Sequence, residues 1–220
     1  MREVNGWFMP SDDFYFDRWI EGAPTKSNGF QREHLLEAFK HVRNWDIAVD
    51  VGAHVGFWAK DMAEKFGKVY CFEPHPKTFA CLAKNMAEYE NVMLSCMALG
   101  MREGHCDIVR GDPRTHNSGS EYIVPKTTGS IRITSLDDVG VQGCDLLKID
   151  VEGYEYAVLK GARKTITKYR PVIIMETDKP FSQRRFGWNR QRPIEYIQRK
   201  FNYTEVAHMR PDRVFVPVDV

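Results

Sequence analysis

The stretch Ala48-Val49-Asp50-Val51-Gly52-Ala53-His54-Val55-Gly56-Phe57 decides the fold of this chain. A run of residues that favour β-structure carries an acid near its end, and two glycines follow, four positions apart. Over residues 57–66 the apolar residues recur at helical spacing. The pattern predicts a buried strand, a tight glycine turn and a helix whose N-terminus faces the turn. We expect unpaired backbone N–H groups there, which would suit a polar ligand.

The glycine pattern narrows the kind of ligand. The dinucleotide fingerprint G-x-G-x-x-G requires glycines where this chain has His54 and Phe57, and the phosphate-loop pattern G-x-x-x-x-G-K-[ST] is absent. The stretch resembles the first motif of S-adenosylmethionine (SAM)-dependent methyltransferases, acid-x-Gly-x-Gly-x-Gly, with His54 in place of the central glycine. An acid and free N–H groups suit a ligand that ends in an ammonium and a carboxylate. A strand, turn and helix without any ligand is the alternative.

The composition is that of a globular protein. The 220 residues are 43% hydrophobic and 28% charged, and the net charge of +1 argues against general polyanion binding. We expect one domain over residues 1–220, with an aromatic-rich cap and helix over 1–43 and a core over 44–220. The five cysteines form no C-x-x-C pair, which favours a reducing, cytoplasmic setting over disulfides or zinc. No apolar run approaches membrane length, so no membrane association is expected.

Strand-like and helix-like patterns alternate along the chain. Strands are expected at 45–51, 68–73, 91–97, 106–109, 131–133, 145–150, 171–176, 203–207 and 214–218, and helices at 30–43, 57–66, 77–89, 154–169 and 192–200. The alternation predicts an α/β fold with a mostly parallel sheet, covered by helices on both faces. The last two strands predict an antiparallel C-terminal hairpin.

The first 29 residues are too aromatic for a disordered tail. They contain Trp7, Phe8, Phe14, Tyr15, Phe16 and Trp19 among prolines, glycines and aspartates. One interpretation is a segment that packs over an edge of the core. The other is a lid that supplies part of a substrate pocket, and the two are compatible.

Four predicted strands end in an acid, namely Asp50, Glu73, Asp150 and Glu176. Ligands of open α/β sheets bind beyond the carboxyl ends of the strands, so these acids would form a negative cleft suited to a cation. Glu73 stands about 20 residues after the glycine turn, the spacing at which an acid binds ribose hydroxyls. The alternative for Glu73 is a carboxylate that caps the following helix.

Lys148 lies inside an apolar strand, on the same face as Asp150 and Glu152 while the chain stays extended. A buried lysine requires a partner or a lowered pKa. We therefore expect either a structural ion pair between Lys148 and Glu152 or Glu176, or a catalytic set of lysine and acids.

Several motifs in order make the chain resemble the FkbM-type SAM-dependent methyltransferases. They are 146–155 with 158–162, 50–56, 72–74, 135–138 and 171–176. The resemblance implies the class I methyltransferase fold, a Rossmann-like, seven-stranded sheet with an antiparallel strand near the C-terminus. It also implies methyl transfer, commonly to a hydroxyl oxygen.

Site residues follow from this resemblance. It implies that the methionine end of SAM is bound by Asp50, Gly52, Ala53, His54 and Gly56, the ribose by Glu73 with Pro74, and the adenine region by Met97 and Ala98. Asp150 would lie beside the methyl group. The family often has asparagine where this chain has His54, whose charge could change with pH.

The chemistry predicted is O-methylation of a sugar, glycan or small metabolite. Asp150 and Glu152 are the candidate bases, with His54 behind them, and Lys148 could orient a carboxylate or polarise the acceptor. The basic and aromatic segment 181–192 is either a flap that binds an anionic or sugar-like acceptor or a surface loop with aromatic anchors. One short cluster in a near-neutral chain makes a nucleic-acid partner a weak prediction.

Three alternatives stay open. One is an NAD-dependent oxidoreductase that uses Glu73 on ribose, against which the missing third glycine argues. Another is a catalytically silent SAM-binding module. The third keeps methyl transfer and adds a divalent metal held by Asp150, Glu152 or Glu176, although no metal is part of the preferred prediction.

Overall fold

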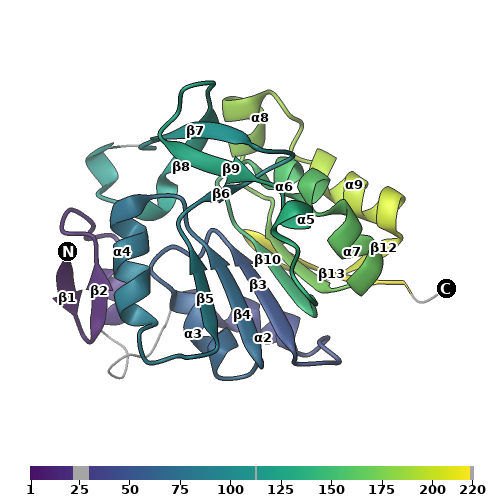
Figure 1. The fold of residues 1–220 in the computed structure, drawn as a ribbon, viewed down its shortest axis with the longest axis horizontal. Coiled ribbons are helices and arrows are strands. Elements are labelled where there is room, and N and C mark those ends of the chain that lie inside the picture. Colours follow the sequence, from purple (N-terminus) through teal and green to yellow (C-terminus); the bar gives the residue numbers. More distant parts are fainter. Residues whose placement is uncertain (22–29, 112, 219–220) are drawn as a thin grey trace.

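A computed structural model describes residues 1–21, 30–111 and 113–218. Its main sheet has the strand order β12-β13-β11-β10-β3-β4-β5 (Figure 1). These strands are β3 (Ile47–Val51), β4 (Lys68–Phe72), β5 (Val92–Ser95), β10 (Leu146–Ile149), β11 (Val172–Glu176), β12 (Tyr203–Met209) and β13 (Asp212–Pro217). The five central strands from β11 to β5 are parallel, and β13 runs antiparallel to both of its neighbours. The predicted α/β fold and C-terminal hairpin are therefore confirmed.

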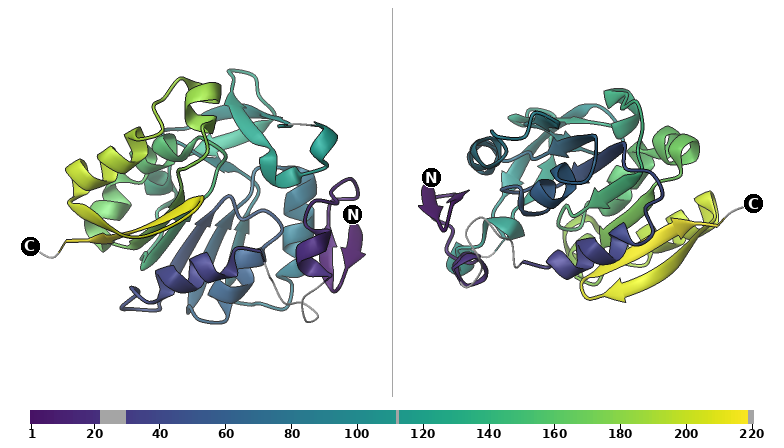
Figure 2. Two further views of the ribbon diagram at one scale, coloured as in Figure 1. Left: turned by 180° about the vertical axis from the view of Figure 1, so that it is seen from behind. Right: turned by 90° about the horizontal axis from the view of Figure 1, so that it is seen from below.

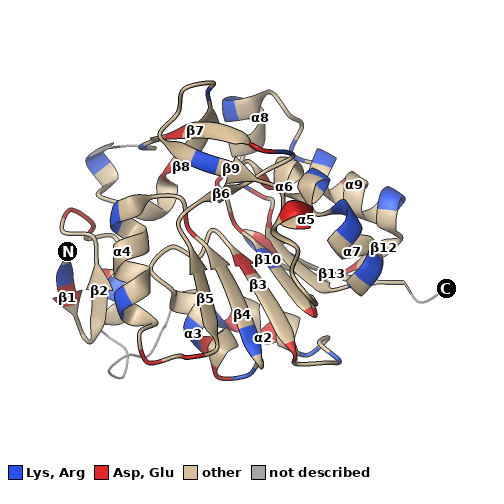
Figure 3. Ribbon diagram, viewed as in Figure 1, with Lys and Arg blue, Asp and Glu red and all other residues tan. Residues whose placement is uncertain are grey.

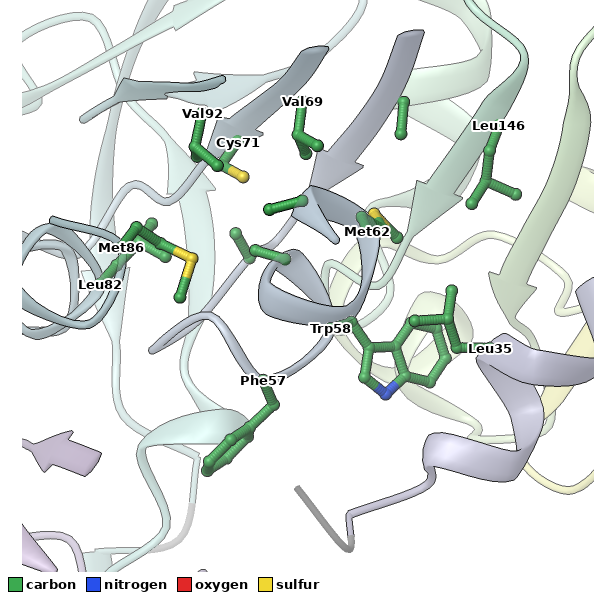
Figure 4. Close-up of a cluster of buried hydrophobic side chains, with 14 of the residues drawn as sticks. Leu35, Phe57, Trp58, Met62, Val69, Cys71, Leu82, Met86, Val92 and Leu146 are labelled. Carbon is green, nitrogen blue, oxygen red and sulfur yellow. The ribbon is translucent and has the colours of Figure 1, made fainter. Parts of the chain in front are cut away.

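Helices cover both faces of this sheet. One face carries α2 (Arg32–Phe39), α3 (Phe57–Ala63) and α4 (Pro76–Asn85), and the other carries α5 (Leu136–Val139), α6 (Glu155–Gly161), α7 (Arg163–Tyr169) and α9 (Arg192–Phe201). Side chains alternate along β10, so Leu146 packs in the first cluster and Leu147 in the second. Figure 4 shows the first cluster, with Trp58 of α3 beside Leu35 of α2.

A second sheet is an addition to the prediction. Strands β6 (Ala98–Leu99), β7 (Gly104–Val109), β8 (Tyr122–Pro125) and β9 (Ile131–Thr134) form it in the order β6-β9-β7-β8. The predicted strand 91–97 ends at Ser95, because Ala98 and Leu99 pair with β9 instead. The predicted helix 154–169 is two helices that meet at Ala162.

The N-terminal segment packs on the core. Its elements are β1 (Arg2–Val4), β2 (Trp7–Met9) and α1 (Asp17–Ile20), and Figure 1 shows the two strands on the side of α4. Trp7, Met9 and Phe16 are buried in the first hydrophobic cluster. The amide of Asn85 joins the strand to α4, since it accepts from Phe8 N at 2.8 Å and donates to Phe8 O at 2.9 Å. The packing interpretation is thereby confirmed for the described part, and residues 22–29 lie outside it.

Charges of both signs are interspersed among the elements (Figure 3), in line with the net charge of +1. None of the helices in the described ranges has the length and apolar character needed to cross a membrane.

Candidate active site

A cavity of about 620 Å³ opens beyond the carboxyl ends of β3, β4, β10 and β11. Ten of the predicted site residues line it: Gly52, Ala53, His54, Glu73, Pro74, Met97, Ala98, Lys148, Asp150 and Glu152. Asp50 and Gly56 are not part of its lining. Asp50 is fully buried beneath the turn, and Gly56 precedes α3 with φ +98°.

The glycine turn is built by close backbone contact. Gly52 has φ +81°, and a Cβ atom there would lie 1.8 Å from the carbonyl oxygen of Asp150. The N–H groups of Gly52 and Ala53 both donate to Phe72 O, at 2.9 and 3.1 Å. The expectation of unpaired N–H groups is wrong for these residues, because the turn folds back over the end of β4. A ligand there would approach the backbone without taking those donors.

Glu73 presents a buried carboxylate to the cavity. Its two oxygens accept from the backbone N–H groups of His54, at 3.0 Å, and His75, at 2.8 Å. Burial raises the pKa of Glu73 to about 7 despite these bonds. The cap of α4 is His75, whose Nδ1 accepts from Lys77 N at 3.2 Å, so the capping alternative for Glu73 is wrong. The carboxylate keeps lone pairs for a diol.

His54 is held by a chain of buried polar groups. Its Nε2 lies 2.6 Å from the hydroxyl of Ser118, which in turn donates to Asp13. Because that hydroxyl proton points to Asp13, His54 must donate from Nε2. Burial, with the charge of Lys148, lowers the pKa of His54 to about 3. The expected change of charge with pH is therefore wrong, since His54 stays neutral.

Lys148 has a different partner from those predicted. Its Nζ lies 2.9 Å from Asp50 Oδ1, and the two side chains are 7% and 1% exposed. The same ammonium donates to the carbonyl oxygen of Gly52. Lys148 and Asp50 are direct neighbours in the pairing of β10 with β3, which explains the choice of partner. The ion pair thus fixes the glycine turn through the hydrogen bond from Lys148 to Gly52.

The carboxylates of three further acids lie close together, and two cations contact two of them. Single carboxylate oxygens of Asp150, Glu152 and Glu176 lie within 4.8 Å of one another. Lys179 Nζ lies 2.6 Å from Glu176 and 3.2 Å from Glu152, and Arg185 lies 3.0 Å from Glu152. Burial and the neighbouring acids raise the pKa of Glu176 well above its usual value. Such oxygens could suit a divalent cation, but Lys179 and Arg185 already form ion pairs with two of the three acids, Glu152 and Glu176.

Of two aromatic groups near the ends of the chain, the N-terminal one lines the cavity and the C-terminal one does not. Tyr15, Phe16 and Trp19 line it, so the N-terminal segment packs on the core and also forms part of the pocket. In α8 (Phe181–Phe186) and the turn after it, Phe186 and Trp188 lie 4.9 and 5.6 Å from the ring of Tyr154. No residue of segment 181–192 lines the cavity, so the structure favours aromatic anchoring over a flap, although residues 181–186 are a short helix and not the expected loop.

Several lining residues carried no sequence signal for the site. They include His34, Asn117, Ser118, Glu121, Tyr122, Lys179 and Arg210. They come from α2, from the segments around the second sheet and from the loops near β11 and β13, far from the glycine motif in sequence.

The sheet order, the glycine turn and the acid-lined cavity define the class: this is the α/β fold of class I SAM-dependent methyltransferases. More particularly, the chain belongs to the methyltransferase FkbM domain family, whose model matches residues 50–210.

Individual relatives agree with this family. The 2-O-methyltransferase NoeI of Sinorhizobium fredii is 27% identical over 154 residues, 60% of this chain and 63% of that protein. The hexuronic acid methyltransferase AglP of Haloferax volcanii is 27% identical over 133 residues, 59% of this chain and 55% of that protein. The chain thus spans less than two thirds of the length of either relative. The crystal structure of methyltransferase FkbM from Methylobacillus flagellatus shares the fold at 17% identity and a TM-score of 0.53, over 80% of this chain and 44% of that one.

Proposed function

We propose that this protein is a SAM-dependent O-methyltransferase that methylates a sugar hydroxyl. The observation that carries the proposal is the buried carboxylate of Glu73, which is oriented by two backbone N–H groups and faces the cavity beside the glycine turn. A carboxylate in that position suits the two hydroxyls of a ribose. The names of the relatives, a 2-O-methyltransferase and a hexuronic acid methyltransferase, favour a sugar acceptor.

The residues present suit SAM as the donor. Gly52 and Ala53 allow close approach of the methionine end, and Asp50 and Gly56 support the turn from outside the cavity. Met97, Ala98 and Pro74 offer apolar surface for the adenine region. Among the described residues, no ion pair or hydrogen bond engages the Asp150 carboxylate, so it can face a positive charge.

Catalysis on this proposal is mainly positioning. Bound SAM supplies a methyl group on a cationic sulfur, already activated for transfer to a nucleophile. The chain's task is to hold the acceptor hydroxyl in line and to accept its proton. Asp150 and Glu152 are the acids that the sequence suggests as the base that accepts this proton. Lys148 is a positioning residue, since it is committed to Asp50 and the turn.

Calorimetry and a transfer assay test the proposal. We expect the purified protein to bind S-adenosylhomocysteine (SAH), the product of SAM, and not NAD. We expect it to move label from methyl-labelled SAM to methyl glucuronoside or methyl glucoside, with the methyl ether identified by mass spectrometry. Binding of NAD in place of SAH would overturn the proposal. SAH binding without transfer to any hydroxyl acceptor would favour the silent binding module.

A further inference from the structure

His34 and Asp212 form a buried pair that the predicted chemistry does not use. His34 Nδ1 lies 2.7 Å from Asp212 Oδ2, and the two side chains are 10% and 5% exposed. His34 belongs to α2, which lies across β11 and β13 on one face of the sheet (Figure 2). His34 is also among the residues that line the cavity. A histidine that is hydrogen-bonded to a buried carboxylate thus borders the cavity in which the acceptor is proposed to bind.

The hydrogen bond determines the tautomer of His34. An ionised carboxylate only accepts hydrogen bonds, so the hydrogen of the neutral ring must sit on Nδ1. The lone pair is then on Nε2. This is the form that a general base requires, with a carboxylate that orients the ring and stabilises the cation formed after proton transfer.

The strand register brings this pair to the edge of the sheet where the methyl group is proposed to lie. Asp212 of β13 is directly opposite Glu176 of β11, and Ile149, just before Asp150, is paired with Met175, just before Glu176. Asp150, Glu176 and Asp212 therefore follow one another across three neighbouring strands, about 10 Å from first to last at the usual strand spacing. Val214 and Ile174 pack in the same hydrophobic cluster as α2, so Asp212 and Glu176 point to the face of His34.

The other candidate bases are less suited. Glu152 is engaged by Lys179 and Arg185. His54 donates from Nε2 to Ser118 and is too weak a base, with a pKa of about 3. Asp150 is proposed to face the cationic donor, and a carboxylate paired with a cation is a weaker base.

We propose that His34 is the general base of the reaction and that Asp212 is the residue that positions it. The inference rests on the proposed methyl transfer. The acceptor O–H bond breaks and its proton goes to His34 Nε2. The acceptor oxygen forms the new C–O bond, and the sulfur keeps the electron pair of the broken S–CH₃ bond, which yields SAH and a methyl ether.

The charges around His34 suit this role. The hydrogen bond to Asp212 raises the pKa of His34 above its ordinary value, against the effect of burial, and Glu33 acts in the same direction. Glu33 Oε1 lies 3.7 Å from Nε2. The charge of Asp150 raises the pKa of Asp212, and the charge of Lys148 lowers it. Because the base must be neutral, turnover should fall as pH drops through this raised pKa.

The pair His208–Asp178 provides a matched control. It has the same 2.7 Å separation, but His208 is not among the residues that line the cavity. We compare H34N, D212N and H208N with methyl glucuronoside as acceptor, and measure kcat against pH, the KM of the acceptor and the Kd of SAH.

H34N should lose 100- to 1,000-fold in kcat and the acid limb of its pH profile, with Kd for SAH within threefold of wild type. D212N should shift that limb to lower pH and lose about tenfold in kcat, because the ring loses its carboxylate partner. H208N should stay within twofold. An H34N variant within threefold of wild-type kcat, or one that loses SAH affinity as much as turnover, would overturn the proposal.

A second measurement separates this inference from the proposed function. If wild type binds SAH but methylates neither glycoside, the proposed acceptor is wrong. Nitrogen NMR of the seven histidines then tests the assignment of His34 as the base without a transfer assay. We expect the Nδ1–H tautomer, a pKa above 6.5 and carbethoxylation of His34 by diethyl pyrocarbonate. An Nε2–H tautomer, or a His34 that the reagent does not reach, would overturn the assignment.

Discussion

The two ends of the cavity are built in different ways. At the end where we propose that the cofactor binds, the cofactor end, the bond from His54 N to Glu73 joins residues 19 apart in sequence, and both belong to one strand–turn–helix–strand unit. At the end proposed for the acceptor, the acceptor end, the bond between His34 and Asp212 joins residues 178 apart. The first end is encoded locally and follows from a short motif. The second exists only once α2 and β13 have docked on the same face of the sheet.

The two ends also differ in the groups that form them. The cofactor end depends on backbone, namely the turn at Gly52 and the N–H groups that hold Glu73. The acceptor end depends on side chains that hold one another, such as His34 with Asp212 and Lys179 with Glu176. Substitutions should therefore disrupt geometry at the first end and change proton affinities at the second.

The largest effect is expected for Gly52→Ala. A Cβ atom 1.8 Å from the Asp150 carbonyl forces β3 and β10 apart at the cavity, and φ +81° is strained for alanine. We expect roughly 3 kcal/mol or more of lost unfolding free energy and a loss of SAH binding beyond 100-fold, measured by urea titration and calorimetry.

Gly140→Ala is the matched control for that substitution. Gly140 has φ +70°, but no atom lies within 4 Å of the place that an added Cβ would take, so only the strain of about 1 kcal/mol should appear. Its SAH affinity should equal that of wild type. A Gly52→Ala protein that behaves like Gly140→Ala would show that the cofactor end does not depend on this backbone contact.

Much of the fold could be predicted because its signals are local. The central strands are short runs of buried, mostly apolar residues, and the helices repeat apolar residues about every 3.6 positions, which the sequence displays directly. The sheet of β6 to β9 could not be predicted in the same way, because its parallel pair joins Ala98 to Ile133. No short pattern specifies a pairing between such distant segments.

The site divides in the same manner. Gly52 and Glu73 could be predicted from spacing, whereas Ser118, which holds His54, lies 64 residues from it. The prediction of Glu152 or Glu176 as the partner of Lys148 is wrong for the same reason. Asp50 lies beside Lys148 only because β3 and β10 are neighbours, and strand order is a property of the whole sheet.

Glu73→Ala should give the next largest effect. It removes a carboxylate that we propose accepts two ribose hydrogen bonds, so SAH should bind roughly 10- to 100-fold more weakly. The KM of the acceptor should stay within threefold, because the acceptor end is untouched. Glu64→Ala, which removes an exposed carboxylate on the turn after α3, should leave calorimetric SAH affinity unchanged. Equal losses of SAH and acceptor affinity would contradict the separation of the two ends.

Ser118→Ala tests a long-range contact of the cofactor end, the hydrogen bond between Ser118 and His54. It removes the hydroxyl between His54 and Asp13, so the buried Nε2 of His54 loses its partner, while the Asp13 carboxylate keeps the backbone N–H groups of Tyr15 and residue 118. We expect thermal and urea unfolding to show a loss of about 1–3 kcal/mol and SAH affinity to fall several-fold. Ser130 is exposed, so Ser130→Ala should stay within about 0.5 kcal/mol of wild type. A Ser118→Ala protein as stable as that control would mean that the polar chain contributes nothing to the attachment of the N-terminal segment.

The smallest expected effect is the pH dependence of SAH binding. Burial raises the pKa of Glu73 to about 7, so the free protein carries a neutral Glu73 below that pH and an ionised one above it. If the ribose prefers the carboxylate, affinity should weaken about 3- to 10-fold from pH 8 to pH 6, within the tenfold per pH unit that one proton allows. Calorimetry at pH 6, 7 and 8 measures this slope.

Two variants assign that slope to a residue. Glu73→Ala should abolish it, while His54→Asn should keep it, because His54 has a pKa of about 3 and stays neutral throughout. The acid limb of kcat should behave in the opposite way, since it is proposed to arise from His34 and should survive in Glu73→Ala. Both limbs fall toward low pH, so wild-type data alone cannot tell them apart. A single variant that removed both limbs would mean that the two ends of the cavity titrate as one unit.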